Sequence, residues 1–249
     1  MLLLDVASRI ASGLSYSQMR LHDLVKAYGA QLRGLLHRED PKEYQAFKDT
    51  NSIEVYKAIH ALFWEMAVLS DTLAEFAAAF CFFRPGVRKL SRLCKFLKEK
   101  PPHDALCEEF LRITDQTSNG WLATFINYRN FFTHTAPLEQ ATNIAFAVQD
   151  LRKLPCGLSI PQLYYALPQE AAEFTSKRSQ GIFFNSWKEL SAASSRRHER
   201  ASEHDALEYL HGCINQFAGL SLELVARSPI SPKPIRIGPE DMIGEIKVS

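Results

Sequence analysis

Six consecutive residues combine the side chains that suit chemistry at a phosphodiester. Arg129, Asn130 and His134 belong to the hexapeptide Arg-Asn-Phe-Phe-Thr-His, which ends an apolar, aromatic-rich stretch. An arginine guanidinium is a permanent cation whose planar fork matches phosphate oxygens. A histidine imidazole can give or take a proton near neutral pH. On an α-helix, Asn130 and His134 lie one turn apart and share a face, with Arg129 beside it.

RNA carries its own nucleophile, the 2′-hydroxyl group. A protein can therefore cleave it without a metal if it positions the scissile phosphate, stabilises the transition-state charge and moves protons. Arg129 suits the first two tasks. His134 suits the third, as a base toward the 2′-hydroxyl or an acid toward the leaving 5′-oxygen, and the Asn130 amide can hold the imidazole or a phosphate oxygen. The alternative is that the arginine and the histidine only satisfy carbonyls or carboxylates near a helix end.

The pattern Arg-Asn-x-x-x-His within a helical hairpin resembles the signature of the HEPN domains. These are all-helical domains found in many prokaryotic toxin and antiviral-defence ribonucleases. The resemblance rests on residues 129–134 and their helical setting, and it extends loosely over residues 14–228. It implies a metal-independent endoribonuclease without cofactors that leaves a 2′,3′-cyclic phosphate. It also implies a homodimer in which two motif copies face one groove, a role in growth arrest or antiphage defence, and room for an antitoxin or another protein partner.

Several neighbouring side chains are candidates for a supporting role. Tyr128 directly before the motif and Thr133 within it are candidate substrate contacts, and the tyrosine ring could stack on a base or belong to the core or an interface. A HEPN-like site often borrows a polar residue from the long second helix, for which Glu65 and Asp71 are candidates as a supporting acid. Either carboxylate has the alternative of a solvated or salt-bridged surface group.

A basic segment provides the best candidate contact with a phosphate backbone. Arg88, Arg92 and Lys95 share one face of a predicted helix, and apolar residues take the other. The net charge is only +1, so RNA binding would depend on such a local patch. These cations would add salt-dependent affinity without sequence specificity. The alternative is an ordinary solvated helix face.

The composition is that of an ordinary globular protein. The chain has 249 residues, of which 46% are hydrophobic and 23% charged, enough for one large core. Its five scattered cysteines form no C-x-x-C pair, which favours reduced thiols and a cytoplasmic protein. We expect no signal peptide and no membrane span. The histidines are scattered, and their spacing does not predict a metal site.

Apolar spacing near 3.6 residues indicates a mainly helical chain. Helices are predicted over 14–38, from a cap at Asn51 and Ser52 up to Pro85, and over 87–98, 103–113, 118–133 and 206–227. The second helix is expected to be buried on two sides, since Ala61, Trp64 and Val68 form a second apolar face. Residues 138–154 read as either helix or strand. Short strands are predicted over 160–167 and 181–185.

Together these observations predict an all-α fold, a HEPN-like helical bundle with a small irregular or β-containing insertion before the last helix. We expect one domain over residues 1–228, with the insertion at 155–205 and a proline-rich, extended tail at 229–249. The predicted function is endoribonucleolytic. The alternatives are a non-catalytic HEPN-like module that binds RNA, nucleotide or protein, and a helical interaction protein in which the motif is structural.

Overall fold

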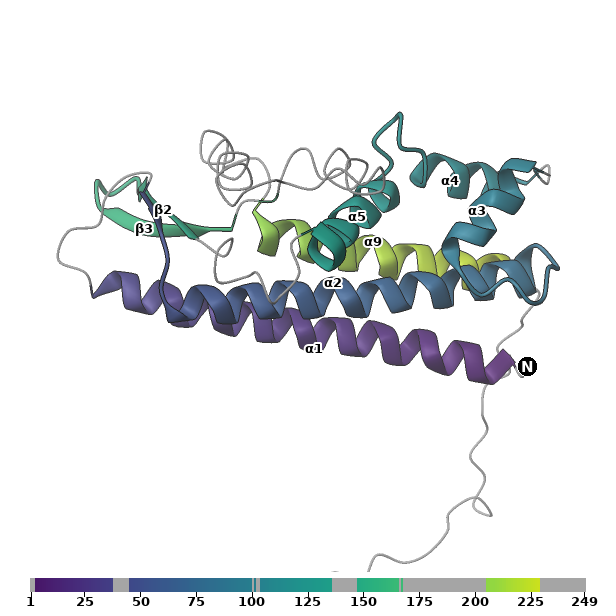
Figure 1. The fold of residues 1–249 in the computed structure, drawn as a ribbon, viewed down its shortest axis with the longest axis horizontal. Helices are drawn as coiled ribbons and strands as arrows, with labels where there is room; N and C mark the ends of the chain where they lie inside the picture. The colour runs from purple at the N-terminus through teal and green to yellow at the C-terminus, as the bar shows by residue number, and fades with distance from the viewer. Residues whose placement is uncertain are drawn as a thin grey trace, which may run out of the picture.

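The protein is mostly helical, with one small antiparallel sheet (Figure 1). The computed structural model describes residues 3–37, 45–99, 101, 104–135, 147–165, 167 and 205–228. The predicted tail and the predicted strand at 181–185 lie outside these residues. No helix within them combines the length and apolarity needed to cross a bilayer. The elements are α1 (Leu3–Leu36), β1 (Gln45–Phe47), α2 (Thr50–Phe76), η1 (Ala77–Cys81), α3 (Leu90–Glu99), α4 (Ala105–Ile113), α5 (Trp121–Asn130), η2 (Phe131–Thr135), β2 (Ala147–Lys153), β3 (Ser159–Tyr164) and α9 (Ala206–Arg227).

The long antiparallel pair α1 and α2 forms the base of the molecule (Figure 1). The two helices approach closely at Gly13, where a Cβ atom would lie only 3.1 Å from the Leu69 side chain. The first helix begins at Leu3, well before the predicted start at residue 14. Val6 and Ile10 explain the difference, because they extend the buried stripe of α1 toward its N-terminus.

Hydrogen bonds between buried polar groups fasten the end of α1 to the start of α2. The cap of α2 is Asp49, two residues before the predicted cap, and its carboxylate accepts from the backbone N–H of Ser52 at 2.8 Å. The Ser52 hydroxyl accepts from the Asp49 N–H in return, which completes a capping box. The buried amide of Gln31 donates to Asp49 Oδ1 at 2.8 Å and to Ser52 Oγ at 2.9 Å.

One predicted buried face of α2 is exposed. Trp64 and Val68 are each more than half accessible to solvent, so the expectation that α2 is buried on two opposite sides was wrong in part. The helix α2 instead contacts α1, α3, α5, η2 and α9. The strip that contains Trp64 and Val68 lies outside those contacts.

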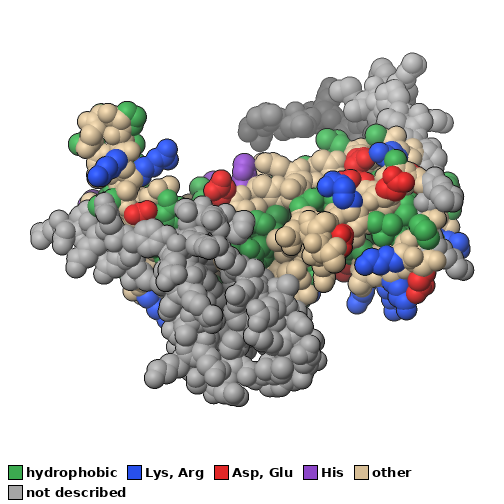
Figure 2. All heavy atoms as spheres, turned by 90° about the horizontal axis from the view of Figure 1, so that it is seen from above, with side chains coloured by type: hydrophobic (Ala, Val, Ile, Leu, Met, Phe, Trp, Pro, Cys, Tyr) green, Lys and Arg blue, Asp and Glu red, His purple; other side chains and the backbone are tan. Residues whose placement is uncertain are grey.

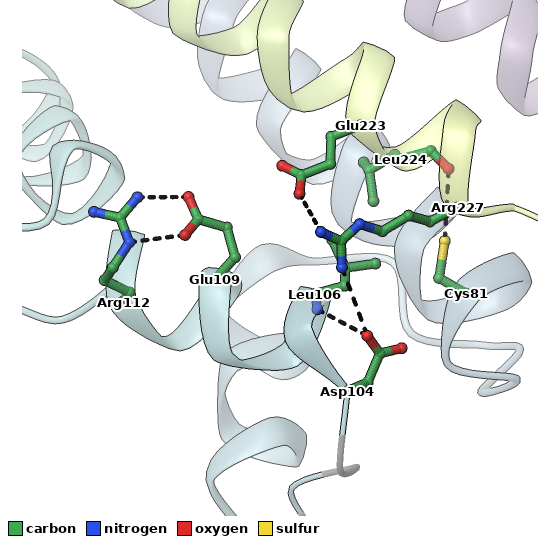
Figure 3. Close-up of polar contacts among 8 residues, drawn as sticks. All are labelled: Cys81, Asp104, Leu106, Glu109, Arg112, Glu223, Leu224 and Arg227. Carbon is green, nitrogen blue, oxygen red and sulfur yellow. Dashed lines mark hydrogen bonds and ion pairs between the residues drawn. The ribbon is translucent and has the colours of Figure 1, made fainter.

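A set of polar contacts joins the start of α4 to the end of α9 (Figure 3). Arg227 of α9 pairs with Glu223 at 2.7 Å and with Asp104 at 3.7 Å, and Asp104 caps α4 by accepting from the Leu106 N–H at 2.8 Å. The turn into α5 then requires a glycine, since a Cβ atom at Gly120 would collide with the backbone at the end of α4. These contacts set the position from which α5 starts.

The sheet has the order β1-β2-β3, and both pairings are antiparallel. The ambiguous stretch 138–154 therefore contains strand β2, and the strand predicted at 160–167 is present as β3. The three residues of β1 were not anticipated. Directly after β3, the Tyr165 hydroxyl donates to the Gln31 side chain at 2.6 Å, which connects the sheet to the capped start of α2.

Candidate functional site

Helix α5 carries Arg129 and Asn130, and aromatic rings hold it against the bundle. Phe125 packs on Phe63 of α2 with ring centroids 5.7 Å apart, and it meets Phe217 of α9 edge-on at 5.3 Å. Figure 1 shows α5 above the middle part of α2, seen almost along its own axis. The motif therefore begins on a short helix that packs against two longer helices, α2 and α9.

The rest of the motif lies in a π-helical turn. The sequence predicted a regular helix through Thr133, whereas the chain changes to a π-helix at Phe131 and keeps it through Thr135. A π turn closes i to i+5 hydrogen bonds and holds more residues than an α turn. The backbone at position 134 therefore comes closer in angle to that of Arg129 than it would on an α-helix. The His134 side chain lies outside the described residues.

Phe132 anchors this π turn to α2. Its ring stacks on Phe63 at a centroid distance of 5.0 Å and contacts Tyr56 at 5.4 Å. Because Phe132 lies inside the π segment, these two contacts fix the segment's position on the bundle. π segments of this kind occur frequently at functional sites.

Arg129 is half-buried on the inner side of α5. It follows the buried residues Leu122 and Phe125 by seven and four positions, which places it on their side of the helix. Its Nε atom is buried and has no hydrogen-bond partner among the described residues. A buried donor without a partner costs about 1–3 kcal/mol, and native proteins contain few of them. This arginine is therefore in a place where an anion would be stabilised.

The other flanking residues differ in their accessibility. Asn130 and Thr133 are half-buried. Tyr128 is only 4% exposed, because its ring packs against Phe63 and edge-on against Tyr209, at 6.4 and 4.9 Å. The tyrosine is therefore a core residue, and stacking of its ring on a base would require it to leave this packing.

The structure does not bring the two candidate acids to the motif. Glu65 follows Phe63 by two residues, a rotation of about 200° on an α-helix, so it lies on the side of α2 away from α5. Asp71 accepts the backbone N–H of Leu90 at 2.9 Å and so caps the start of α3. Its carboxylate has a structural task there.

The basic face of α3 is also separate from the motif. Arg88, Arg92 and Lys95 are exposed as predicted, but α3 begins at Leu90, so the prediction that all three share one helix face was wrong for Arg88. Arg88 lies 3.7 Å from buried Glu75 of α2, and Lys95 lies 3.8 Å from Glu99. Glu75 follows Phe63 by twelve residues on α2, a rise of about 18 Å. Figure 1 accordingly shows α3 near the end of the bundle, away from α5.

His60 lies beside the motif, although the sequence did not predict it as a site residue. It follows Tyr56 by four residues and precedes Phe63 by three, so it shares with them the face of α2 that holds Phe132. Burial lowers the pKa of His60 below its ordinary value. The sequence does show that His60 is spaced one helical turn from Tyr56 and from Phe63. This spacing is informative only together with the Phe132 ring, which belongs to another helix.

The described residues contain no group of three or more His, Cys, Asp or Glu side chains arranged to hold a metal ion. In the described part of the motif, the group that could take part in chemistry is thus the half-buried guanidinium of Arg129, at the junction of an α and a π turn. The half-buried imidazole of His60 lies on α2.

Comparison of the chain with protein-family models, with curated proteins and with solved structures returned no match.

Proposed function

We propose that this protein is a metal-independent endoribonuclease of the HEPN type, acting as a homodimer. One observation carries the proposal: the Nε atom of Arg129, at the point where the motif begins, is buried and has no hydrogen-bond partner among the described residues. The mainly helical fold is compatible with the HEPN-like bundle that the motif suggests. A role in toxin action or antiphage defence is part of the same proposal.

In the proposed reaction, Arg129 donates hydrogen bonds to the non-bridging oxygens of the scissile phosphate. The 2′-hydroxyl loses its proton to an imidazole and attacks phosphorus, and the 5′-oxygen leaves with a proton from a second acid. The products are a 2′,3′-cyclic phosphate and a 5′-hydroxyl end. His134 performs one proton transfer, and His134 of a second copy performs the other. Asn130 supports either the imidazole or the phosphate.

The deciding experiment is incubation of the purified protein with total RNA in EDTA, followed by analysis of the new ends by mass spectrometry. The wild type should cleave and leave 2′,3′-cyclic phosphates, and His134→Ala should not. His211→Ala is the matched control, because His211 is exposed on α9 and lies outside the motif. It should cleave like the wild type.

Other outcomes would replace the proposal. Loss of cleavage in EDTA with recovery in magnesium would indicate a metal-dependent nuclease. RNA binding by the wild type and by His134→Ala, with cleavage by neither, would favour the non-catalytic binding module. Equal cleavage by the wild type and His134→Ala would remove the motif from the reaction.

A further inference from the structure

The turn that follows α2 holds an aromatic residue in a conformation that does not suit it. Phe83 has φ 52°, in the left-handed region, and its residue surface is 73% exposed. The turn is closed on both sides of Phe83 by backbone hydrogen bonds, from the Phe82 N–H to the Ala77 carbonyl at 2.9 Å and from the Arg84 N–H to the Ala78 carbonyl at 2.6 Å. Helices that end in this way usually place glycine at such a position.

Neither the turn nor the core explains a phenylalanine here. The side chain does not contribute to the turn's hydrogen bonds, and a bulky residue with positive φ is an outlier. Gly86, three residues later, adopts φ 98° and shows that the same loop uses glycine where it needs that conformation. Strained residues of this kind cluster where a side chain serves binding.

Phe83 begins the most basic segment of the described chain. Residues 83–99 contain six basic residues and one acidic residue, and all six cations are exposed. Figure 2 shows several Lys and Arg side chains at the end of the molecule that carries this segment, with Asp and Glu side chains among them. The guanidinium of Arg84 lies over the Phe96 ring, 5.0 Å from its centroid, so this cation is held in place beside Phe83.

Most of this charge is not paired with acidic side chains of the residues that the structure describes. Within the described part of the chain, Arg88 pairs with Glu75 and Lys95 with Glu99, both at more than 3.6 Å. With other described residues, no ion pair is formed by the remaining four cations, which are Arg84, Lys89, Arg92 and Lys98. An exposed ring beside uncompensated cations is the combination that binds single-stranded nucleic acid, where the ring stacks on a base and the cations contact phosphates.

We propose that Phe83 and the exposed cations of residues 84–98 form a binding surface for single-stranded RNA, with Phe83 stacking on a base. The surface deepens the proposed function, on which it rests, because it would hold the RNA at one end of the bundle while the motif contacts another part of the same strand. Duplex RNA fits less well because its base faces are covered by stacking. A lipid surface fits less well because binding there requires a larger apolar area than one ring.

The test measures the affinity for fluorescently labelled oligouridylate by anisotropy in EDTA, in a His134→Ala background that prevents cleavage. Phe83→Ala and Phe83→Gly should each weaken binding by about fivefold or more, since stacking on one base is lost. Phe83→Tyr should bind like the parent. The melting temperature of Phe83→Gly should not fall, because glycine relieves the strained turn, so weaker binding cannot be ascribed to unfolding.

Two further variants separate stacking from charge. Leu222→Ala is the matched control, since Leu222 on α9 is also 73% exposed but has no basic segment around it, and it should bind like the parent. Arg92→Gln should reduce the slope of log affinity against log salt concentration by about one.

Parent-like affinity of both Phe83→Ala and Phe83→Gly would overturn the proposal. So would binding to vesicles of anionic phospholipid that depends on Phe83 while RNA binding does not. The catalytic proposal is tested separately, by measuring RNA cleavage by protein that retains His134. RNA binding that depends on Phe83, without any cleavage, supports the surface and rejects the nuclease. Cleavage by a protein whose RNA binding does not depend on Phe83 supports the nuclease and rejects the surface.

Discussion

At the scale of single residues, Arg129 is where function and stability are expected to oppose each other. A buried donor without a partner lowers the stability of the fold, so its removal should not be harmful to folding. We expect Arg129→Met to raise the free energy of unfolding by about 1–3 kcal/mol or leave it unchanged, and to abolish RNA cleavage. Urea unfolding and the cleavage assay in EDTA measure the two effects.

Arg129→Lys is the matched variant, because it keeps the charge but loses the planar fork. Its cleavage should be much weaker than that of the wild type. A clear loss of stability in Arg129→Met would instead identify the arginine as a structural residue and weaken the catalytic proposal.

His60 predicts a pH dependence of stability. Burial lowers its pKa in the folded state, so the unfolded chain takes up the proton first as pH falls. Its contribution to the free energy of unfolding is complete above about pH 6.5 and is lost as pH falls below that value. We expect the difference in urea midpoint between pH 7.5 and pH 5.5 to be smaller in His60→Gln than in the wild type. Equal differences in the two proteins would show that His60 is not shielded from water.

Residue types and spacing led to the prediction of Arg129 and Asn130 as site residues, because the chemistry of a guanidinium beside an amide is visible in the sequence. They were not enough to place Tyr128, whose burial depends on Phe63 and Tyr209 from helices far apart in the chain. His60 escaped for the same reason. Its significance comes from the packing of Phe132 on Tyr56 and Phe63 of the same helix face, which only the tertiary fold brings about.

At the scale of elements, Asp71 can be either the cap of α3, through its hydrogen bond to the start of that helix, or the supporting acid of the motif. As a cap, Asp71→Ala should lower the free energy of unfolding by about 1–2 kcal/mol, because the Leu90 N–H loses its acceptor. Cleavage by the folded protein should remain. Thermal unfolding and the cleavage assay at a temperature well below the transition test both statements.

Asp71→Asn provides the control, since its amide oxygen can still accept the Leu90 N–H, and its stability should lie close to that of the wild type. If both variants lose cleavage while keeping their stability, Asp71 acts as the supporting acid that the motif led us to expect.

Periodicity identified the helices, and the last one was predicted with the bounds it has in the structure. Other boundaries depended on features that a 3.6-residue period does not contain. The cap at Asp49 is selected together with Gln31 of α1. The π segments η1 and η2 follow the α pattern in sequence and depart from it only in hydrogen bonding. The short strand β1 gains its structure from pairing with β2, about a hundred residues later.

At the scale of the whole molecule, buried polar contacts connect the helices to the sheet. Asp205, which caps α9, accepts hydrogen bonds from the Tyr165 N–H at 2.7 Å and the Tyr28 hydroxyl at 3.0 Å. Burial raises the pKa of Asp205. The Tyr165 carbonyl in turn accepts from the Ala206 N–H at 2.9 Å. No local pattern predicts such contacts, because their partners come from α1, from the end of β3 and from the start of α9.

These contacts also bring together two points of the chain that are distant in sequence. Tyr165 and Asp205 are 40 residues apart in sequence but joined by hydrogen bonds. Closing a flexible loop costs only about 0.6 kcal/mol more for each doubling of its length. Replacement of residues 168–204 by a short glycine-serine linker should therefore leave a folded bundle whose circular dichroism melt is close to that of the wild type. A melt shifted far downward would show that the replaced residues help to hold the bundle.

The hydrogen-bonded pair Tyr165 and Asp205 thus marks an insertion point, at which one sequence can be exchanged for another without rebuilding the helices on either side. Evolution can use such a point to change what a helical scaffold acts on, and an engineer can use it to graft a recognition segment onto the bundle.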